Sequence, residues 1–339
     1  MRLPFRLLLT LAVALAAGAP AAQQVEEREK LAQTGLKFLS VAGDARAAGL
    51  SSAMTAAEGG AAMLFYNAAG MAWMDRGSDV SLSQTGWIAD IDYNHGAVAF
   101  RPANGRFGVI GVTATFVDYG DLQETVRADN DQGYVDVGTF SPTAFAVGLG
   151  YARAVTDRFA VGGQIKYASQ DIGTAISQVG TEGTYQRDGI QEGTLAYDFG
   201  VHYKTGFESL RFAVSAQNFA PDLSFSEESF QTPLTFQIGL AMDVLDLTSL
   251  DPSVHSLVLS TDASNPRDFS EQIRVGGEYE FMDTLALRAG YSFPTDQEGL
   301  SLGAGVRQAL GGVGFGADYS YTDFGVFSGV HRIAVRFSL

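Results

Sequence analysis

Catalytic chemistry has little support in this sequence, because its reactive side chains are few and scattered. The four histidines, His95, His202, His255 and His331, follow no pattern that pairs a nucleophile with a base. Cysteine is absent, which excludes a thiolate metal site. The segment 129–133 (Asp-Asn-Asp-Gln-Gly) has acids suited to calcium, but it lacks the closing Glu and the full alternation of ligands. We therefore expect no enzyme, no cofactor and no bound metal ion.

Single charged side chains occur instead within segments where large apolar residues alternate with small ones. A charge on the lipid-facing side of a transmembrane strand costs about 2–4 kcal/mol at mid-bilayer, so such charges belong on the inner face of a barrel. The charged residues of this kind are Lys166, Asp198, Arg211, Arg274, Glu278, Arg288, Arg307 and Asp318. We predict that they line the lumen.

Period two is the dominant pattern from residue 78 onward, as expected for a sheet with two unlike faces. In segment 195–204, one face carries Leu, Tyr, Phe and Val and the other carries Ala, Asp, Gly, His and Lys. The pattern predicts an all-β transmembrane fold, a fourteen-stranded antiparallel β-barrel. Its strands are expected near 79–88, 93–101, 106–117, 143–153, 158–170, 194–204, 209–218, 233–244, 254–262, 271–280, 284–293, 300–308, 313–322 and 330–339. Segment 121–127 lies in an acidic stretch, and we expect it to be a loop.

The connections between these strands alternate in length. Those longer than ten residues, 118–142, 171–193 and 219–232, all belong to one set, whereas the other set consists mostly of tight turns such as 102–105. Outer-membrane barrels have long outer loops and short periplasmic turns, so we expect both ends of the barrel in the periplasm. Aromatic residues near strand ends are expected to form interfacial girdles. They are Trp87, Tyr93, Tyr151, Tyr167, Tyr203, Tyr291 and Tyr321.

The first residues predict export. Arg2 and Arg6 precede an apolar run over 7–17, and a small-residue stretch that ends at Ala21 offers a cleavage site. A membrane-spanning helix needs about 20 apolar residues, so this run is too short for an anchor. We expect a signal peptide over 1–21 and an integral protein of the bacterial outer membrane, in contact with its lipid. The net charge of −16 makes nucleic acid an unsuitable partner.

The predicted lumen is rich in small residues, for example Gly148 and Gly150 on one strand. Glycine weakens a strand unless another group approaches it closely. The apolar segment 35–77 is the obvious group to fill the space, as short helices packed inside the barrel. We therefore expect a periplasmic lead-in with a lumenal plug over 22–77 and a transmembrane barrel over 78–339.

Five residues of the plug are candidates for a gate: Phe38, Asp44, Arg46, Asn67 and Trp73. Asn67 is suited to cap the short helix that follows it. Asp44 and Arg46 have apolar neighbours, among which an unpaired charge would be costly. They form either a latch between plug and wall, or a structural pair with each other or with a lumenal charge such as Arg288 or Glu278.

Residues 35–74 resemble the N-terminal signature of the PorV/PorQ family, which belongs to the wider FadL-like group of fourteen-stranded outer-membrane proteins. The matching blocks are Phe38-Leu39, Asp-Ala-Arg-Ala-Ala-Gly at 44–49 and Asn-Ala-Ala-Gly at 67–70. The family usually has Pro where this chain has Ala68. Proline in the first helical turn is favourable but dispensable, so the expected fold does not depend on it.

The resemblance implies two different functions. PorV/PorQ proteins act in type IX protein secretion and surface attachment, where they bind cargo C-terminal domains or sortase partners. FadL-like relatives carry hydrophobic compounds and use the plug as a gate. Our leading hypothesis is the secretion role, in which outer loops contact partner proteins. The alternative is a FadL-like uptake channel for hydrophobic small molecules, and a third possibility is a purely structural barrel.

Overall fold

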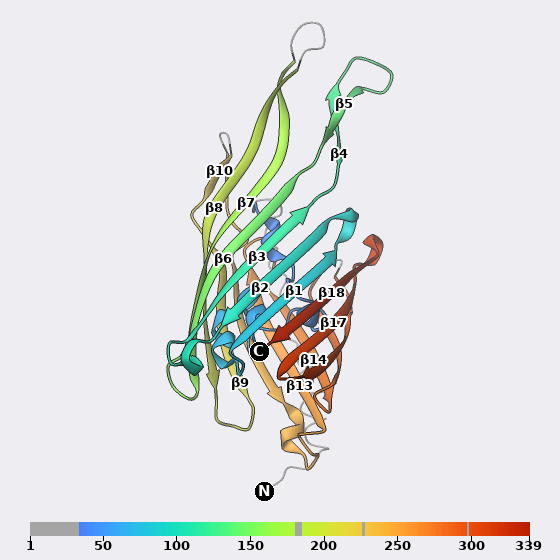
Figure 1. Cartoon of the computed structure of the whole chain (residues 1–339). Helices are drawn as coiled ribbons and strands as arrows, with labels where there is room; N and C mark the ends of the chain where they lie inside the picture. Colours follow the sequence, from blue (N-terminus) through green and yellow to red (C-terminus); the bar gives the residue numbers. More distant parts are fainter. Residues whose placement is uncertain (1–33, 180–184, 226–227, 297) are drawn as a thin grey trace, which may run out of the picture.

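The computed structural model describes residues 34–179, 185–225, 228–296 and 298–339 (Figure 1). The predicted signal peptide over 1–21 lies outside these residues. Within the described part of the chain, no helix is both long and apolar enough to cross a membrane.

The described residues form a closed barrel of fourteen antiparallel strands, in which neighbours along the chain pair and β1 pairs with β18 (Figure 1). The predicted fold class is thus confirmed. The barrel strands are β1 (Ser78–Gly86), β2 (Asp92–Phe100), β3 (Val109–Asp118), β6 (Thr143–Ala154), β7 (Phe159–Val179), β8 (Tyr185–Lys204), β9 (Arg211–Phe219), β12 (Thr235–Asp243), β13 (His255–Pro266), β14 (Gln272–Phe281), β15 (Leu285–Phe293), β16 (Ser301–Leu310), β17 (Val313–Asp323) and β18 (Gly329–Ser338).

Strands β7 and β8 run well beyond the predicted 158–170 and 194–204, and their hairpin rises above the rest of the barrel (Figure 1). Most of the segment 171–193, expected as a loop, is therefore strand. The pairing continues to Val179 and Tyr185 through two register shifts. Period two fades in this polar segment because a hairpin surrounded by water has no apolar face to maintain.

Two small sheets stand beside the barrel. β4 (Leu122–Arg127) pairs with β5 (Tyr134–Phe140), and β10 (Leu223–Phe225) pairs with β11 (Glu228–Phe230). The expectation of a loop at 121–127 is wrong, although the strand there lies outside the barrel. Both sheets and the β7–β8 hairpin extend from the same end of the barrel, which we call the long-loop end. The opposite end, where β1 begins and β18 ends, is the short-turn end.

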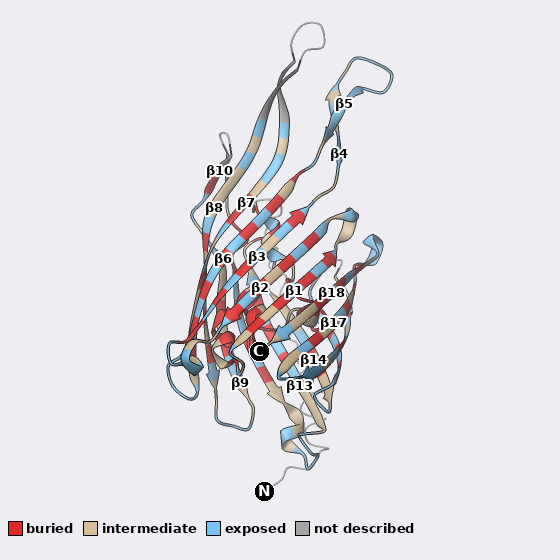
Figure 2. Ribbon diagram, viewed as in Figure 1, coloured by how far each residue is buried: buried red, intermediate tan, exposed pale blue. Residues whose placement is uncertain are grey.

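Burial alternates along the barrel strands, as the sequence predicts (Figure 2). The exposed outer face carries large apolar side chains, such as Val147, Leu195 and Leu240, whereas Ala, Ser and Gly occupy most inward positions. Short 3₁₀ helices lie in the connections, namely η4 (Ile88–Asp90), η5 (Pro102–Gly105), η6 (Val244–Leu247) and η7 (Gly325–Phe327).

Two of the predicted girdle residues do not lie on the outer face of the barrel. Tyr93 is only 4% exposed, because it shares the inward parity of His95 in β2. Trp87 is half-buried and packs edge-on against Tyr93 and Phe324. The girdle assignment of Trp87 and Tyr93 is therefore wrong. Tyr151, Tyr167, Tyr203 and Tyr291 are exposed on the outer face, as expected.

The outer face gives a direct test of membrane insertion. Leu240 lies near the middle of β12 and is 48% exposed. We expect Leu240→Arg to lower the free energy of unfolding by about 2–4 kcal/mol in lipid, because it places a charge in the bilayer. Urea unfolding from vesicles measures this. Leu250→Arg, at a similarly exposed leucine in the β12–β13 connection, should change little; equal losses would contradict the assigned lipid face.

Candidate functional site

The barrel lumen is occupied by the segment between residue 34 and β1. It contains four short helices: η1 (Lys37–Ser40), α2 (Ala45–Ala48), η2 (Ala61–Phe65) and η3 (Ala68–Trp73). Side-chain caps begin two of them. The carboxylate of Asp44 accepts a hydrogen bond from the backbone N–H of Arg46 at 2.5 Å, and Asn67 Oδ1 accepts one from Ala69 N–H at 3.1 Å. These caps satisfy N–H groups that the short helices leave free.

Large apolar side chains of this plug pack against small side chains of the wall. The resulting core combines plug residues with inward residues of β2, β3 and β6. Its members include Leu50, Met54, Met63, Leu64, Tyr66, Met71 and Met74 from the plug, and Ala97, Ala99, Val109 and Ala152 from the wall. Burying such side chains stabilises the closed arrangement, because each removes apolar surface from water.

Glycines in the wall allow the plug to approach closely. A Cβ added to Gly162 would lie 2.5 Å from the backbone nitrogen of Ala69 in η3, and one added to Gly150 would lie 2.3 Å from the Leu64 side chain. A Cβ added to Gly290 would lie 2.4 Å from the backbone carbonyl carbon of Leu50. The glycine-rich lumen is thus the surface on which the plug backbone lies.

A buried charge network joins α2 to the wall. Both carboxylate oxygens of Glu278 in β14 accept hydrogen bonds from Arg46, at 2.6 and 2.9 Å. Glu278 also accepts one from Arg288 Nε at 2.5 Å, and Arg288 donates to Asp318 at 2.6 Å. Arg307 Nη2 lies 3.7 Å from Glu278. Arg46 therefore pairs with a lumenal charge rather than with Asp44.

Asp44 lies beside this network without an ion pair of its own among the described residues. Burial raises the pKa of the Asp44 carboxyl, and the nearby carboxylate of Asp318 raises it further. Asp44 thus caps α2 while its charged form is disfavoured by its surroundings.

A second anchor involves Glu58 of the plug. Its carboxylate lies 3.1 Å from Lys204 Nζ and 4.0 Å from Arg211 Nη1. Trp73 Nε1 donates to His202 Nδ1 at 3.0 Å, and Lys204 Nζ lies 3.9 Å from the centre of the Trp73 ring. The end of η3 is therefore held against β8 by both a hydrogen bond and a cation–π contact.

Two wall carboxylates bind the plug backbone. Asp79 at the start of β1 accepts hydrogen bonds from Ala61 N–H and from Arg336 Nε, both at 2.7 Å. Asp262 in β13 accepts one from Thr55 N–H at 2.9 Å. Each carboxylate satisfies a buried N–H that would otherwise be unpaired.

The remaining predicted lumenal charges lie on the wall, apart from the plug anchors. Lys166 and Asp198 pair with each other at 2.8 Å, and Arg274 donates to Gln272 at 3.2 Å. Arg307 also bonds Glu280. In the described part of the chain, no group of three or more His, Cys, Asp or Glu side chains is placed to hold a metal ion.

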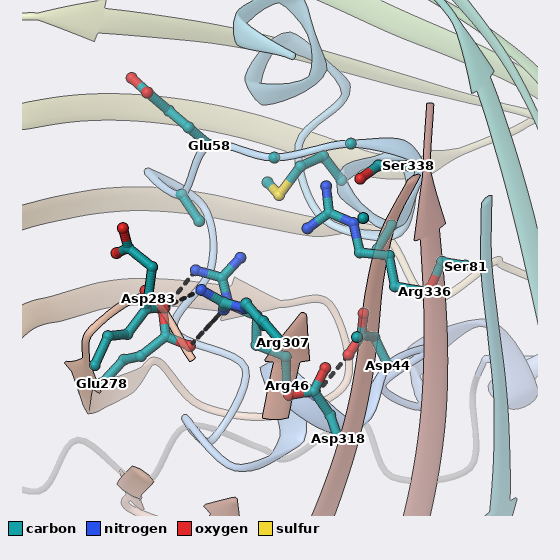
Figure 3. A pocket seen from close by; sticks show the side chains of 18 of the residues that line it. Asp44, Arg46, Glu58, Ser81, Glu278, Asp283, Arg307, Asp318, Arg336 and Ser338 are labelled. Carbon is teal, nitrogen blue, oxygen red and sulfur yellow. Dashed lines mark hydrogen bonds and ion pairs between the residues drawn. The ribbon is translucent and has the colours of Figure 1, made fainter. Parts of the chain in front are cut away.

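A cavity of about 980 Å³ (Figure 3), lined by charged and apolar side chains alike, lies between the plug and the short-turn end of the barrel. The plug contributes Arg46 and Glu58 to its lining, and the wall contributes Glu278, Arg307 and Arg336. The cavity contains charges of both signs.

Apolar side chains from the plug and the wall gather on the long-loop side of the lumen. Phe38 is buried there in a second cluster, beneath side chains from the β1–β2 connection and from β10. Its other members include Leu36, Leu39, Val41, Trp87, Ile91, Tyr93, Val117, Tyr119, Leu223 and Phe230. The plug therefore packs against apolar side chains on its long-loop side and borders a cavity with charged residues on its short-turn side.

Sequence reasoning missed several lumenal charges, including Asp79, Arg332 and Arg336. The period-two signal could have identified the two arginines, because they alternate with Ile333 and Val335 of the outer face. No comparable signal indicated that Asp79 would bind a backbone N–H in the plug.

This architecture has counterparts among solved structures. No protein-family model and no curated protein matches the chain. Solved structures do match. The monoaromatic hydrocarbon channel CymD gives a TM-score of 0.55 at 13% identity, over 88% of this chain and 97% of that one. The Pseudomonas putida toluene transporter TodX gives 0.57 at 10%, over 86% and 96%. A Pseudomonas aeruginosa FadL homologue gives 0.54 at 13%, over 87% and 97%. The chain has a FadL-type fold.

Identities this low show only the fold. The structural matches confirm the FadL-like fold that the resemblance of residues 35–74 implies. Membership of the PorV/PorQ family stays a prediction. CymD is described as a channel and TodX as a transporter.

The contact between Arg46 and Glu278 can be measured by a double-mutant cycle. We expect Arg46→Ala and Glu278→Ala to be non-additive, with a coupling of about 0.5–3 kcal/mol in the free energy of unfolding, because they share a buried pair. Urea unfolding from vesicles gives the four values. The exposed pair Asp157 and Arg158 is the control and should couple by only about 0–1 kcal/mol. Purely additive Arg46 and Glu278 variants would contradict the anchor.

The close approach at Gly162 gives a second test. We expect Gly162→Ala to displace η3 and raise the ion conductance of the barrel in planar bilayers, because the new Cβ meets the plug backbone. Overpacking of this kind also costs about 1–3 kcal/mol of stability. Gly189→Ala in β8, where a Cβ meets nothing within 4 Å, should leave the conductance unchanged. An unchanged conductance in both variants would contradict a plug seated on Gly162.

Proposed function

We propose that this protein is an outer-membrane channel for the uptake of hydrophobic compounds, closed in this state by the plug. The observation that carries the proposal is the apolar cluster at the long-loop end of the lumen, in which plug residues such as Phe38 pack against wall and loop residues such as Tyr93. A channel for polar solutes needs a water-filled entrance, and apolar aromatic walls do not favour one. Hydrophobic solutes gain free energy on binding among apolar side chains of this kind, about 25 cal/mol per Å² of apolar surface removed from water.

The structural likenesses support the same proposal. CymD is described as a channel for monoaromatic hydrocarbons and TodX as a toluene transporter, and each matches over nearly its full length. The exposed apolar face suits the membrane, and the acidic β4–β5 hairpin suits the aqueous outer surface. These likenesses favour the channel over a role in type IX secretion. Binding of secretion partners or cargo C-terminal domains remains a prediction.

A reversible lock on the plug tests the proposal. Ala56 of the plug shares a small apolar cluster with Ala213 of β9, and the chain has no natural cysteine. We expect oxidised Ala56→Cys/Ala213→Cys protein in proteoliposomes to stop the uptake of radiolabelled toluene, because the plug can no longer leave its seat. Reduction should restore uptake.

The single variant Ala56→Cys, treated with the same oxidant, controls for damage and should retain uptake. Mass spectrometry confirms that the disulfide has formed. Unchanged uptake through fully cross-linked protein would show that solute does not pass the plug. No uptake by the unmodified protein would overturn the proposed function.

A further inference from the structure

Exposed arginines gather on one side of the short-turn end of the barrel. Arg106 follows η5 in the β2–β3 connection, whereas Arg153 ends the lipid-facing row of β6 and Arg158 lies in the β6–β7 turn. The two connections are neighbours, because β3 pairs with β6 and the Tyr151 hydroxyl donates a hydrogen bond to the backbone oxygen of Phe107 at 3.0 Å. We call Arg106, Arg153 and Arg158 the basic rim.

The basic rim has little charge compensation of its own. Among the described residues, Arg106 and Arg153 form no ion pair. Arg158 Nε lies 4.0 Å from the carboxylate of Asp157, whose side chain is 88% exposed. An exposed pair at that distance contributes little binding energy. The three guanidinium groups are therefore available to an anion outside the barrel.

The outer face of β6 places Arg153 at a defined depth in the bilayer. Leu149, Tyr151 and Arg153 are alternate residues exposed on one face of this strand, and each step of two residues moves about 7 Å toward the short-turn end. Aromatic side chains favour the boundary between hydrocarbon and headgroups, and basic side chains favour the charged groups beyond it. This order places the Arg153 guanidinium at the level of the lipid phosphates.

Apolar side chains project from the same end of the barrel. Phe107 and Val155 are each 59% exposed at the β2–β3 and β6–β7 connections, and Phe207 is 58% exposed at the β8–β9 turn. Arg158 joins this third turn to the rim, because a Cβ added to Gly206 would lie 2.5 Å from its Nη1. Large apolar groups beside free cations suit a surface that is itself both apolar and anionic, as a lipid headgroup layer is.

The opposite side of the same end carries the opposite charge. Asp246 and Asp251 lie in the β12–β13 connection and Asp283 lies in the β14–β15 turn, and segments 244–254 and 282–284 contain no Lys or Arg. Asp283 follows the aromatic Phe281 by two residues, as Arg153 follows Tyr151 on β6. The two sides thus present aromatic residues followed by charges of opposite sign.

We propose that the basic rim binds phospholipids with anionic headgroups, and that the barrel selects these lipids on this side alone. Arginine forms short, charge-assisted hydrogen bonds with phosphate oxygens, so Arg106, Arg153 and Arg158 supply the headgroup contacts. Phe107 and Val155 supply the apolar contacts between headgroups. The acids on the opposite side repel the same lipids.

A lipid fits the rim better than a soluble acidic protein does. Arg153 belongs to the same row of outward side chains as Leu149, so the rim is continuous with the surface that contacts the bilayer. Because this interaction concerns the membrane and not the lumen, it holds whether or not the barrel carries hydrophobic compounds.

The absence of natural cysteine allows a fluorescent label on each side of the full chain in phosphatidylcholine nanodiscs. Val161→Cys lies beside Arg153 in the β6–β7 pairing, and Leu285→Cys lies two residues from Asp283. Both positions are on the outer face. The probes are doxyl-labelled phosphatidylglycerol and doxyl-labelled phosphatidylcholine, which quench the fluorescence of a label that they approach.

We expect phosphatidylglycerol to quench the label at Val161→Cys at least about threefold more effectively than phosphatidylcholine, because basic side chains near a membrane surface attract anionic lipid. At Leu285→Cys phosphatidylglycerol should show no advantage. Added salt should weaken the preference at Val161→Cys, because it screens exposed charges.

Charge variants assign the preference to the rim. Arg106→Gln/Arg153→Gln/Arg158→Gln should abolish it, and these exposed positions allow the barrel to fold, which thermal unfolding checks. Arg127→Gln, at an exposed arginine of β4 at the long-loop end, is the matched control and should keep it. Asp283→Arg should create a preference for phosphatidylglycerol at Leu285→Cys.

Three results would overturn the proposal. Equal quenching by the two lipids at Val161→Cys would show that the rim does not select anionic lipid, as expected if it served a soluble partner. An equal preference at both labels would show a general attraction without a preferred side. A preference that survives in the folded triple variant would show that the three arginines do not cause it.

Discussion

The position of the plug depends most on one buried carboxylate, that of Glu278. It accepts two hydrogen bonds from the Arg46 guanidinium, and it also accepts one from Arg288 and so neutralises the positive charge of that residue. Two guanidinium groups in a low-dielectric interior require such a partner, because neither can be neutralised by losing its proton. Helix α2 must therefore lie where Arg46 can reach β14, and the apolar and glycine contacts of the plug are arranged around that point.

The sequence predicts the barrel well because lipid and lumen impose opposite demands on alternate residues. Thr235–Asp243 illustrates this: every second residue faces lipid, and the observed strand lies within the predicted 233–244. Glu278 and Arg288 could be assigned to the lumen by the same reasoning, since a charge in lipid is costly. The period-two signal fails above the membrane, where β7 and β8 continue as polar strands with no apolar face.

The candidate site is less predictable, because its contacts join segments far apart in the chain. The pattern around Arg46 indicates that its charge needs a partner, but nothing local selects Glu278, 232 residues away, over other carboxylates. Trp87 shows a different difficulty. An aromatic residue at a strand end suits both a membrane interface and a lumenal cluster, and only the closure of the barrel shows that it faces Arg332.

The carboxylate of Asp79 connects three parts of the molecule at the seam where the first and last strands meet. It lies on β1, bonds the backbone of the plug at Ala61 and pairs with Arg336 on β18. The final strand therefore completes an interaction that also needs the plug in its seat. The plug directly precedes β1, so the carboxylate of Asp79 holds the first strand, the last strand and the plug at one point. Closure of the barrel and seating of the plug therefore stabilise each other in this chain.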